Sequence, residues 1–378
     1  MAKQKVLFTA SIAKHILRFH LPYLKWFQDK GFETHVACEG DEKIPLADKQ
    51  WKVPFIRMPF SAGHFKVYRE LKNIIDREQY ALIHCHTPMA SLLTRLAARD
   101  ARKKGTKVLY TAHGFHFYKG APLYYWLTYY PIELLASRWA DGIITINHED
   151  NDLIRKQGNQ KTDYFLVPGV GVNQNRFFPV SAQQKLELRN VHGFDTKDFL
   201  IVYAAEFIRR KNHPFLIKSS AQFLREHPDV KILLCGRGKH DEDYRRLVEK
   251  EKLTDSMLFM GFRTDIHEIF QMSDIGISTS KQEGLAINML EVMMCGIPVL
   301  ASKIRGHVEY VEPGKTGFLY QPDDAEDFMK QFRTVYNQRD TLQKLSANCV
   351  STASGYEIEQ AVAATAAIYK RYLPEYGK

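Results

Sequence analysis

The segment Asp274–Ser302, DIGISTSKQEGLAINMLEVMMCGIPVLAS, contains the pattern that decides the fold. The apolar run Ile275–Ile277 ends in small polar residues, which predicts a buried strand that leads into a loop. From Glu283 onward the apolar residues recur at helical spacing, and Gly296 followed by Pro298 predicts the end of that helix. A second apolar run then predicts another strand. The segment is therefore expected to form strand, loop, helix and strand, a pattern typical of parallel sheets.

Two carboxylates distinguish this segment from an ordinary strand and helix. Glu283 lies in the loop, and Glu291 lies in the apolar helix, where a carboxylate is costly unless it is paired or hydrogen-bonded. Both acids could bind ligand hydroxyls, while the free N–H groups of Leu285, Ala286 and Ile287 could bind an anion. The same spacing also fits an acid at a helix N-terminus and a salt-bridged Glu291, so the residues alone leave both interpretations open.

Length and composition indicate a globular chain with two domains. The chain has 378 residues, of which 45% are hydrophobic, and it contains no apolar run long enough to span a membrane. The first strand follows Met1 almost directly, without the apolar region and cleavage site of a signal peptide. The five cysteines are scattered and form no CxxC pair, which favours reduced thiols and argues against a structural zinc site. We therefore expect a cytoplasmic protein.

The net charge of +10 is unevenly distributed along the chain. Residues 1–180 hold 26 of the 53 Lys and Arg residues but only 16 of the 43 Asp and Glu residues, so the remainder is neutral. An excess of this size predicts an anionic partner for the first half: a membrane surface, a diphosphate-bearing substrate or nucleic acid. The charge excess could also serve only to keep the protein soluble.

Short apolar runs alternate with helical patterns along the whole chain. In the first half the expected strands are Lys5–Ala10, Thr34–Cys38, Ala81–His86, Lys107–Thr111, Ile143–Ile146 and Phe165–Val167. The pattern restarts with Phe199–Ala204, Lys231–Leu234, Met257–Met260, Ile275–Ile277 and Pro298–Ala301. Alternation of this kind predicts two α/β domains, each a doubly wound, Rossmann-like parallel sheet with helices on both faces.

Glycines and prolines between residues 168 and 179 mark the expected domain boundary. We expect a first domain over residues 1–178, a second over 179–356, and a final helix over 357–372. Ligands of such sheets bind outside the carboxyl ends of the strands, so two facing sheets would form an inter-domain cleft. Other expected features are a loop at Ser11–His15 and helices near His20–Asp29, Val67–Arg77 and Ser91–Lys104.

Three adjacent cations, Arg209, Arg210 and Lys211, follow the first strand of the second domain. At the carboxyl end of a strand they are well placed to bind a diphosphate, since Arg gives bidentate contacts and Lys a point charge. A solvated basic loop is the other interpretation.

Two further strand ends of the second domain carry weaker signals. Gly236 would allow a ligand close to the backbone, and Phe262 and Arg263 follow the next strand. Turn chemistry would explain all three. The acids at 241–243 precede a helical pattern and are expected to cap a solvated helix rather than to bind a metal.

The first domain holds a run rich in His and aromatic residues, TAHGFHFYKG at 111–120. His113 stands beside a glycine at a strand end, where it could approach a reacting centre, although a lone His is usually structural. From Phe115 to Tyr130 half of the residues are aromatic, which suits either a membrane interface or a buried core. Residues expected to face an acceptor or membrane are Lys14, His15, His86, His116, Lys119 and Trp126.

The motifs together resemble family 4 glycosyltransferases. The resemblance rests on Glu283-Gly-Leu with Glu291 eight positions later, on the Cys295-Gly-Ile-Pro-Val turn and on most of the chain. The stretches 110–120 and 83–88 are similar to bacterial enzymes that act on undecaprenyl-diphosphate-linked sugars. The resemblance implies the two-domain GT-B fold, with the final helix packing back on the first domain. It implies a retaining transfer that needs no metal or other cofactor.

The resemblance also assigns roles to residues. It implies that Glu283 contacts the donor sugar, Glu291 the nucleotide ribose, and His113 the region of donor sugar and acceptor. Lys211 matches the family's diphosphate-binding Lys, but Glu206 stands where the family usually has Arg, so Arg209 or Arg210 is expected to substitute. The backbone near Phe262 and Arg263 is expected to contact the base.

The expected activity is therefore transfer of a hexose or N-acetylhexosamine from a UDP-sugar to a polyprenyl-diphosphate-linked saccharide. This would place the enzyme in polysaccharide, capsule or glycan synthesis, peripherally bound to the anionic inner face of the cell membrane, with no role for nucleic acid. Two alternatives fit the same architecture: a nucleotide-sugar epimerase, and a non-enzymatic sugar-binding protein.

Overall fold

The computed structural model describes residues 3–56, 58 and 60–374 of the chain. The chain forms two compact units, with unit 1 at Met1–Val170 and Glu359–Lys378 and unit 2 at Gly171–Ile358. The chain therefore passes from one unit to the other after residues 170 and 358, a few residues from the expected boundaries at 178 and 356. Val172 explains the difference, because it pairs with Glu357 in a parallel bridge and its N–H donates to the Tyr356 carbonyl at 2.8 Å. The segments that enter and leave unit 2 thus belong to it.

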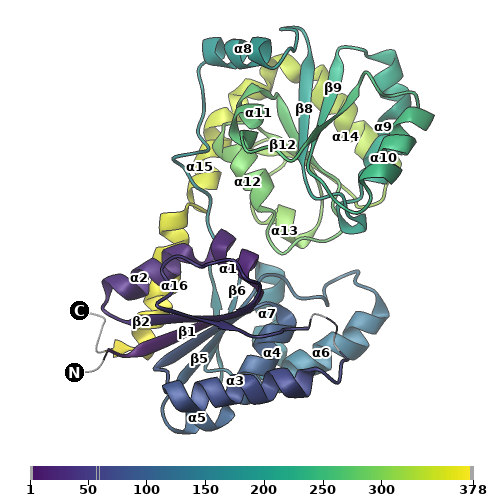
Figure 1. Ribbon diagram of the computed structural model, residues 1–378. Helices are drawn as coiled ribbons and strands as arrows, with labels where there is room; N and C mark the ends of the chain where they lie inside the picture. Colours follow the sequence, from purple (N-terminus) through teal and green to yellow (C-terminus); the bar gives the residue numbers. More distant parts are fainter. Residues whose placement is uncertain (1–2, 57, 59, 375–378) are drawn as a thin grey trace. The chain divides into compact units, whose positions relative to one another are not determined.

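Unit 1 is built on a seven-stranded parallel sheet (Figure 1). Its strand order is β3-β2-β1-β4-β5-β6-β7, so the direction of winding reverses between β1 and β4. The strands are β1 (Lys5–Ile12), β2 (Glu33–Glu39), β3 (Lys49–Lys52), β4 (Leu82–His86), β5 (Lys107–Ala112), β6 (Gly142–Thr145) and β7 (Asp163–Leu166).

Helices cover both faces of this sheet because neighbouring strand residues point in opposite directions. On one face Leu7 and Cys85 join a core with α3 and α4; on the other, His84 meets Tyr369 of α16. The helices are α1 (Ala13–Phe19), α2 (Leu21–Asp29), α3 (His64–Glu78), α4 (Pro88–Ala97), α5 (Arg99–Lys103), α6 (Leu123–Ser137), α7 (His148–Gln157) and α16 (Ile358–Tyr372). The expected packing of the final helix on the first domain is confirmed by these contacts.

Two local expectations for unit 1 are wrong, and one strand was not expected. The predicted loop Ser11–His15 contains the start of α1, whose buried Ala13 and Ile16 anchor a short helix. The helix expected over Ser91–Lys104 is interrupted at Ala98, which separates α4 from α5. Strand β3 was not expected because its sequence, KQWK, has no apolar run at this partly exposed sheet edge.

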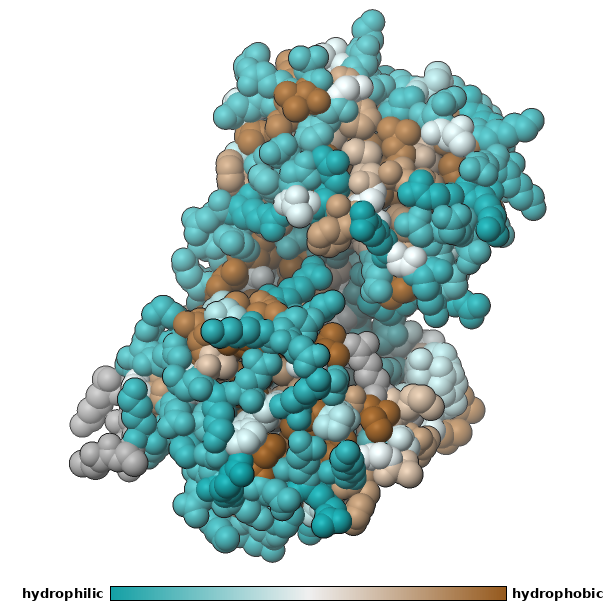
Figure 2. All heavy atoms as spheres, viewed as in Figure 1, coloured by the Kyte–Doolittle hydropathy of each residue, from teal (hydrophilic) through white to brown (hydrophobic). Residues whose placement is uncertain are grey.

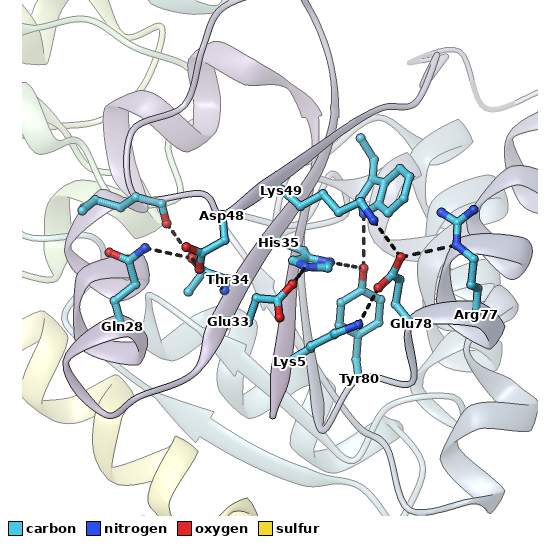
Figure 3. Close-up of polar contacts among 12 residues, drawn as sticks. Lys5, Gln28, Glu33, Thr34, His35, Asp48, Lys49, Arg77, Glu78 and Tyr80 are labelled. Atoms are coloured by element: carbon cyan, nitrogen blue, oxygen red, sulfur yellow. Dashed lines mark hydrogen bonds and ion pairs between the residues drawn. The ribbon is translucent and has the colours of Figure 1, made fainter. Parts of the chain in front are cut away.

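A polar network fastens β3 to the rest of unit 1 (Figure 3). Lys5 Nζ lies 2.7 Å and Lys49 Nζ 2.9 Å from oxygens of the Glu78 carboxylate. These cations lower the pKa of Glu78 to about 2. Nearby, His35 Nδ1 lies 2.8 Å from the Tyr80 hydroxyl. An open cavity of about 730 Å³ adjoins Lys5, Glu78 and Tyr80. It lies at the amino ends of β1, β4 and β5, away from the edge where ligands of parallel sheets bind.

Unit 2 repeats this architecture with a six-stranded parallel sheet. Its order is β10-β9-β8-β11-β12-β13, so the reversal lies between β8 and β11. The strands are β8 (Phe199–Ala204), β9 (Val230–Cys235), β10 (Met257–Gly261), β11 (Ile275–Ser278), β12 (Val299–Ser302) and β13 (Gly317–Tyr320). The helices are α8 (Ala182–Val191), η1 (Arg209–Lys211), α9 (His213–Glu226), α10 (Asp241–Lys250), α11 (Ile266–Met272), α12 (Ile287–Met294), α13 (Arg305–Val308), α14 (Ala325–Asn337), η2 (Arg339–Leu345) and α15 (Ser346–Ser354).

The two doubly wound sheets expected from the sequence are thus confirmed, and each has one point at which the strand order reverses. Ligands of such sheets bind beside the carboxyl ends of the strands at this point. In the described part of the chain, every helix is too short or too polar to cross a bilayer.

Candidate active site

The predicted cation loop of unit 2 begins where β8 ends. Arg209–Lys211 form the short helix η1, and the next residue, Asn212, has a left-handed backbone with φ 57°. The Tyr203 hydroxyl donates to the Lys211 carbonyl at 2.5 Å, which ties the loop to the core of the sheet. Arg209 is exposed, whereas Lys211 is largely buried. The loop therefore presents two exposed positive charges, Arg209 and Arg210, and one largely buried charge, Lys211, near a strand end.

Glu283 lies against these cations. Lys211 Nζ is 2.5 Å from Glu283 Oε1, and Arg210 Nη1 is 2.8 Å from Oε2. Burial would raise the pKa of Glu283, but the charges of Lys211 and Arg210 outweigh it and lower the pKa from 4.5 to about 2. The carboxylate is therefore ionised at neutral pH, and it holds Lys211 and Arg210 together at the reversal point between β8 and β11.

Two residues that sequence reasoning missed hold Glu283 in place. Arg305 Nε donates to the Glu283 carbonyl at 3.2 Å. A Cβ atom on Gly306 would lie only 2.7 Å from the Glu283 Cβ, so this position admits no larger residue without a shift. The available signal was the Arg-Gly pair that follows β12, at the same sheet edge as Glu283.

Helix α12 begins at Ile287, four residues later than Glu283 had suggested. Ile287, Asn288 and Glu291 are the partly exposed residues of this helix, whose other side chains are buried. Glu291 thus shares a face with Ile287, as expected from its spacing. Asn288, which the sequence did not single out, donates from Nδ2 to the Ala204 carbonyl at 2.8 Å and so joins α12 to the end of β8.

The expectation of three free N–H groups before α12 is wrong for Ile287. Its N–H donates to the Leu285 carbonyl at 3.1 Å, which closes a tight turn. Within the described residues we find no acceptor for the N–H groups of Leu285 and Ala286. The anion-binding capacity of this turn therefore rests on two backbone donors, beside Glu283.

The ends of β9 and β10 carry the remaining predicted donor residues. Gly236 has φ 156°, and a Cβ there would lie 2.0 Å from the Ala205 carbonyl oxygen, so only glycine fits. Phe262 is 69% exposed, and Arg263 Nε donates to Asp265 at 2.8 Å. The acids at 241–243 lie in the first turn of α10, at the expected helix terminus, but the N-cap residue is His240 and it makes no side-chain cap hydrogen bond.

In unit 1 the predicted residues His15, His86 and His113 gather at the carboxyl ends of β1, β4 and β5. His86 is the last residue of β4, and its Nδ1 lies 3.4 Å from Nε2 of His113. The His15 and His113 rings are 4.9 Å apart. His20 and His84, which the sequence did not single out, complete the group, with His20 stacked on His86 at 3.7 Å. The sequence signal that could have identified this cluster is a His at or near the end of each of three strands or helices.

Burial dominates the electrostatics of this histidine cluster. It lowers the pKa of His113, and the neighbouring His15 and His84 imidazoles lower it further. The pKa values of His20 and His86 fall for the same reasons. At neutral pH these rings are therefore uncharged, so His113 can exchange hydrogen bonds with a substrate but is a weak base.

The aromatic stretch divides between core and surface. Phe115 and Phe117 are buried and stacked at 4.7 Å, and Trp126 packs against the same core, with its ring 5.8 Å from Phe117. His116 stacks on Tyr129 at 4.4 Å. The predicted surface cations Lys14 and Lys119 are exposed. The buried-core interpretation is thus correct for Phe115, Phe117 and Trp126, and the membrane interpretation stays a prediction for the exposed residues.

A buried ion pair anchors helix α6. Arg95 of α4 is fully buried, and its Nη1 lies 2.7 Å from Glu133 Oε1 of α6. The outward side of α6 carries Leu123, Tyr124 and Leu127, which are 56–71% exposed. The predicted site residues form two groups, because Lys211 and Glu283 belong to unit 2 and the histidine cluster belongs to unit 1.

Comparisons with known proteins agree with this arrangement. The family model described as "Glycosyl transferase 4-like" matches residues 5–147, and that described as "Glycosyl transferases group 1" matches residues 184–351. A Bacillus subtilis (strain 168) protein named as a glycosyltransferase, EpsD, is 41% identical over 98% of this chain and 97% of its own length.

Two more distant comparisons extend the picture. An Escherichia coli protein named UDP-Gal:alpha-D-GlcNAc-diphosphoundecaprenol alpha-1,3-galactosyltransferase is 24% identical over 88% of this chain and 87% of its own. The structure of Anabaena HepE in complex with UDP and glucose superposes with a TM-score of 0.77 at 20% identity, covering 97% of this chain and 100% of that one. By its sequence and its two parallel-sheet units, the chain belongs to the family 4 glycosyltransferases of the GT-B fold.

Proposed function

We propose that this glycosyltransferase moves a hexose or N-acetylhexosamine from a UDP-sugar to a polyprenyl-diphosphate-linked saccharide, with retention of anomeric configuration. The observation that carries the proposal is the contact of Lys211 and Arg210 with Glu283 at the reversal point of the unit 2 sheet. A diphosphate beside these cations and a sugar hydroxyl beside the carboxylate would satisfy both groups. The epimerase and sugar-receptor alternatives have no comparable support.

The chemistry proposed for unit 2 is electrostatic. As the donor bond breaks, negative charge grows on the departing UDP, and Lys211, Arg210 and the exposed Arg209 would stabilise it. The free N–H groups of Leu285 and Ala286 point to an additional site for a phosphate oxygen. Glu291 would accept hydrogen bonds from the ribose, on the partly exposed face of α12. These charges and dipoles would do the work for which other transferases use a bound metal, so UDP binding should need none.

The acceptor side of the proposal rests on unit 1. The Escherichia coli relative is named for an acceptor with an undecaprenol diphosphate, which supports an acceptor of this class. His113, His86 and His15 would contact its polar part, as neutral rings that donate and accept hydrogen bonds. The excess of basic residues in this half would favour a diphosphate.

A membrane-facing surface would give unit 1 access to a lipid acceptor. Figure 2 shows apolar side chains gathered over the part of unit 1 that Figure 1 labels α6. Leu123, Leu127 and Tyr124 are exposed there, and Phe60 and Phe65 are 71% and 67% exposed elsewhere in the unit. Apolar side chains with nearby cations such as Lys119 are suited to the surface of an anionic bilayer.

The proposal is tested by direct assay. The protein is incubated with a panel of UDP-sugars and an extract of polyprenyl-linked saccharides, and the lipid fraction is analysed by mass spectrometry. The expected result is one product whose mass rises by a single sugar residue, with UDP released in equal amount. Turnover of UDP-sugar without a lipid product would contradict the acceptor class.

A further inference from the structure

The histidine cluster contains buried ring nitrogens without partners. Both ring nitrogens of His20 and Nε2 of His86 are buried, and they have no hydrogen-bond partner among the described residues. Each of these side chains is about 1% exposed. Buried polar atoms in native proteins nearly always have a partner, so orphaned nitrogens on neighbouring rings indicate a missing ligand.

The cluster has the composition and spacing of a metal site. One nitrogen each from His15, His20, His86 and His113 lies within 4.8 Å of all the others. A tetrahedral zinc ion bound at about 2.05 Å separates its nitrogen ligands by about 3.4 Å. The distance from His86 Nδ1 to His113 Nε2 is 3.4 Å, so this pair already has the required separation. The remaining separations are at most 4.8 Å, so an ion would draw these nitrogens together, and the stacked rings of His20 and His86 would have to turn apart to bind it.

The fold fixes these ligands from separate elements. His86 ends β4, His113 follows β5, and His15 and His20 lie on and after α1, which follows β1. Below them His84 uses both of its nitrogens, for Tyr369 and Thr111 at 2.7 Å each, and so it supports the cluster without competing as a ligand. His15 and His113 are partly exposed, which provides a path for an ion to enter.

We propose that His15, His20, His86 and His113 bind a divalent transition-metal ion of the zinc type in unit 1. Imidazole nitrogens suit zinc, cobalt, nickel and copper, whereas magnesium and calcium prefer oxygen ligands. The four rings bring no negative charge, so the ion retains its full charge at the reversal point of the sheet. The inference goes beyond the proposed function and does not rest on it, because metal binding is measured without either substrate. With the ion bound, His15, His86 and His113 would offer an acceptor only the N–H of the second ring nitrogen.

The test uses the full chain and Co²⁺ as a spectroscopic probe. The protein is treated with a chelator, desalted and titrated with Co²⁺ in the absence of nucleotide. The expected result is one ion per chain, with the visible absorption of four-coordinate cobalt and its displacement by Zn²⁺. Elemental analysis of the untreated protein is expected to find zinc in similar amount. Absence of any cobalt band in the wild-type protein would overturn the inference.

Variants distinguish this site from adventitious binding. His20→Ala is decisive because the proposed function gives His20 no role, and it should weaken cobalt binding at least about 100-fold. His148→Ala in unit 1 and His227→Ala in unit 2 are matched controls that should leave binding unchanged. If His20→Ala fails to fold by circular dichroism, the partly exposed His15→Ala decides instead. Equal cobalt affinity in the ligand variants and the controls would refute the site.

Discussion

Lys211 and Glu283 illustrate how one residue's role depends on its partner. In the ligand-free site each neutralises the other, and the 2.5 Å contact keeps both in place despite their burial. A bound diphosphate would offer Lys211 a second anion, so the lysine would be shared between donor and carboxylate. The loss of Lys211 should therefore affect both catalysis and folding.

For Lys211→Ala we expect a fall in kcat of about 10²–10³-fold, with a smaller change in KM for the donor. Negative charge on the diphosphate grows as the donor bond breaks. Lys211 therefore stabilises the transition state more than the bound substrate. Steady-state kinetics measure both constants, and Lys218→Ala, an exposed lysine of α9, is the control. Full activity would transfer the role to Arg209 or Arg210.

For Glu291→Ala we expect UDP to bind about 10- to 150-fold more weakly. Loss of one charged hydrogen-bonding group costs about 1.5–3 kcal/mol. Calorimetric titration measures the affinity, with Glu249→Ala on the exposed side of α10 as the control. The same titration in EDTA should give an unchanged wild-type affinity. Unchanged UDP affinity in folded Glu291→Ala would remove this residue from the site.

Glu283 should give unit 2 a measurable dependence of stability on pH. Its folded pKa of about 2 lies below the unfolded 4.5, so its stabilisation is complete above pH 4.5 and is lost as the pH falls toward 2. Between these values the unfolding free energy should decline by about 1.4 kcal/mol per pH unit more than in Glu283→Gln. Urea unfolding at pH 5 and pH 3.5, followed by circular dichroism, compares the two proteins. Parallel declines would mean that Glu283 is not ion-paired.

At the residue scale, the contact of Glu283 with the cation loop joins residues that the sequence had singled out, while their role in binding a donor stays a prediction. Glu283, Glu291 and Lys211 were recognisable from spacing and from the family resemblance. Arg305, Gly306 and His20 were missed because their roles come from contacts between distant segments. The turn that occupies the Ile287 N–H was also beyond prediction, since helical spacing does not specify the conformation of the residues before the helix.

At the scale of elements, strands were predicted wherever an apolar run is buried on both faces. Strand β3 lacks such a run and is recognised only by its partners, strand β2 and the Glu78 carboxylate that Lys49 contacts. Helix α1 was hidden because its seven residues include only two that are fully buried. Short elements of this kind depend on tertiary packing rather than on local pattern.

Helix α6 should depend strongly on its buried ion pair. Glu133→Ala leaves the Arg95 guanidinium buried without its carboxylate, which typically costs about 3–5 kcal/mol. All four tryptophans, Trp26, Trp51, Trp126 and Trp139, lie in unit 1, so their fluorescence during urea unfolding reports on this unit alone. Glu70→Ala on α3 is the control. A loss below 1 kcal/mol would show that α6 is held by its apolar contacts instead.

At the scale of the whole molecule, the charge excess of residues 1–180 and the apolar surface of α6 predict binding to anionic vesicles. Leu123→Ser with Leu127→Ser should weaken cosedimentation, as should raising the salt, because screening acts within about 8 Å at physiological ionic strength. These leucines are better probes than Trp126, whose substitution would also disturb the core. Val191→Ser, an exposed apolar residue of unit 2, is the control. Equal binding to neutral and anionic vesicles would contradict the predicted contribution of the positive charges to membrane binding.

The path of the chain through unit 1 has a consequence for biosynthesis. Tyr369 is fully buried there, bonded to His84 and packed 4.6 Å from Phe27, yet it is translated after the whole of unit 2. On the ribosome, the first half therefore emerges without the helix that completes its core, whereas unit 2 is continuous in sequence. Nascent unit 1 is then a natural client of chaperones, and a released chain that ends at residue 358 should contain a protease-resistant unit 2 and a protease-sensitive unit 1.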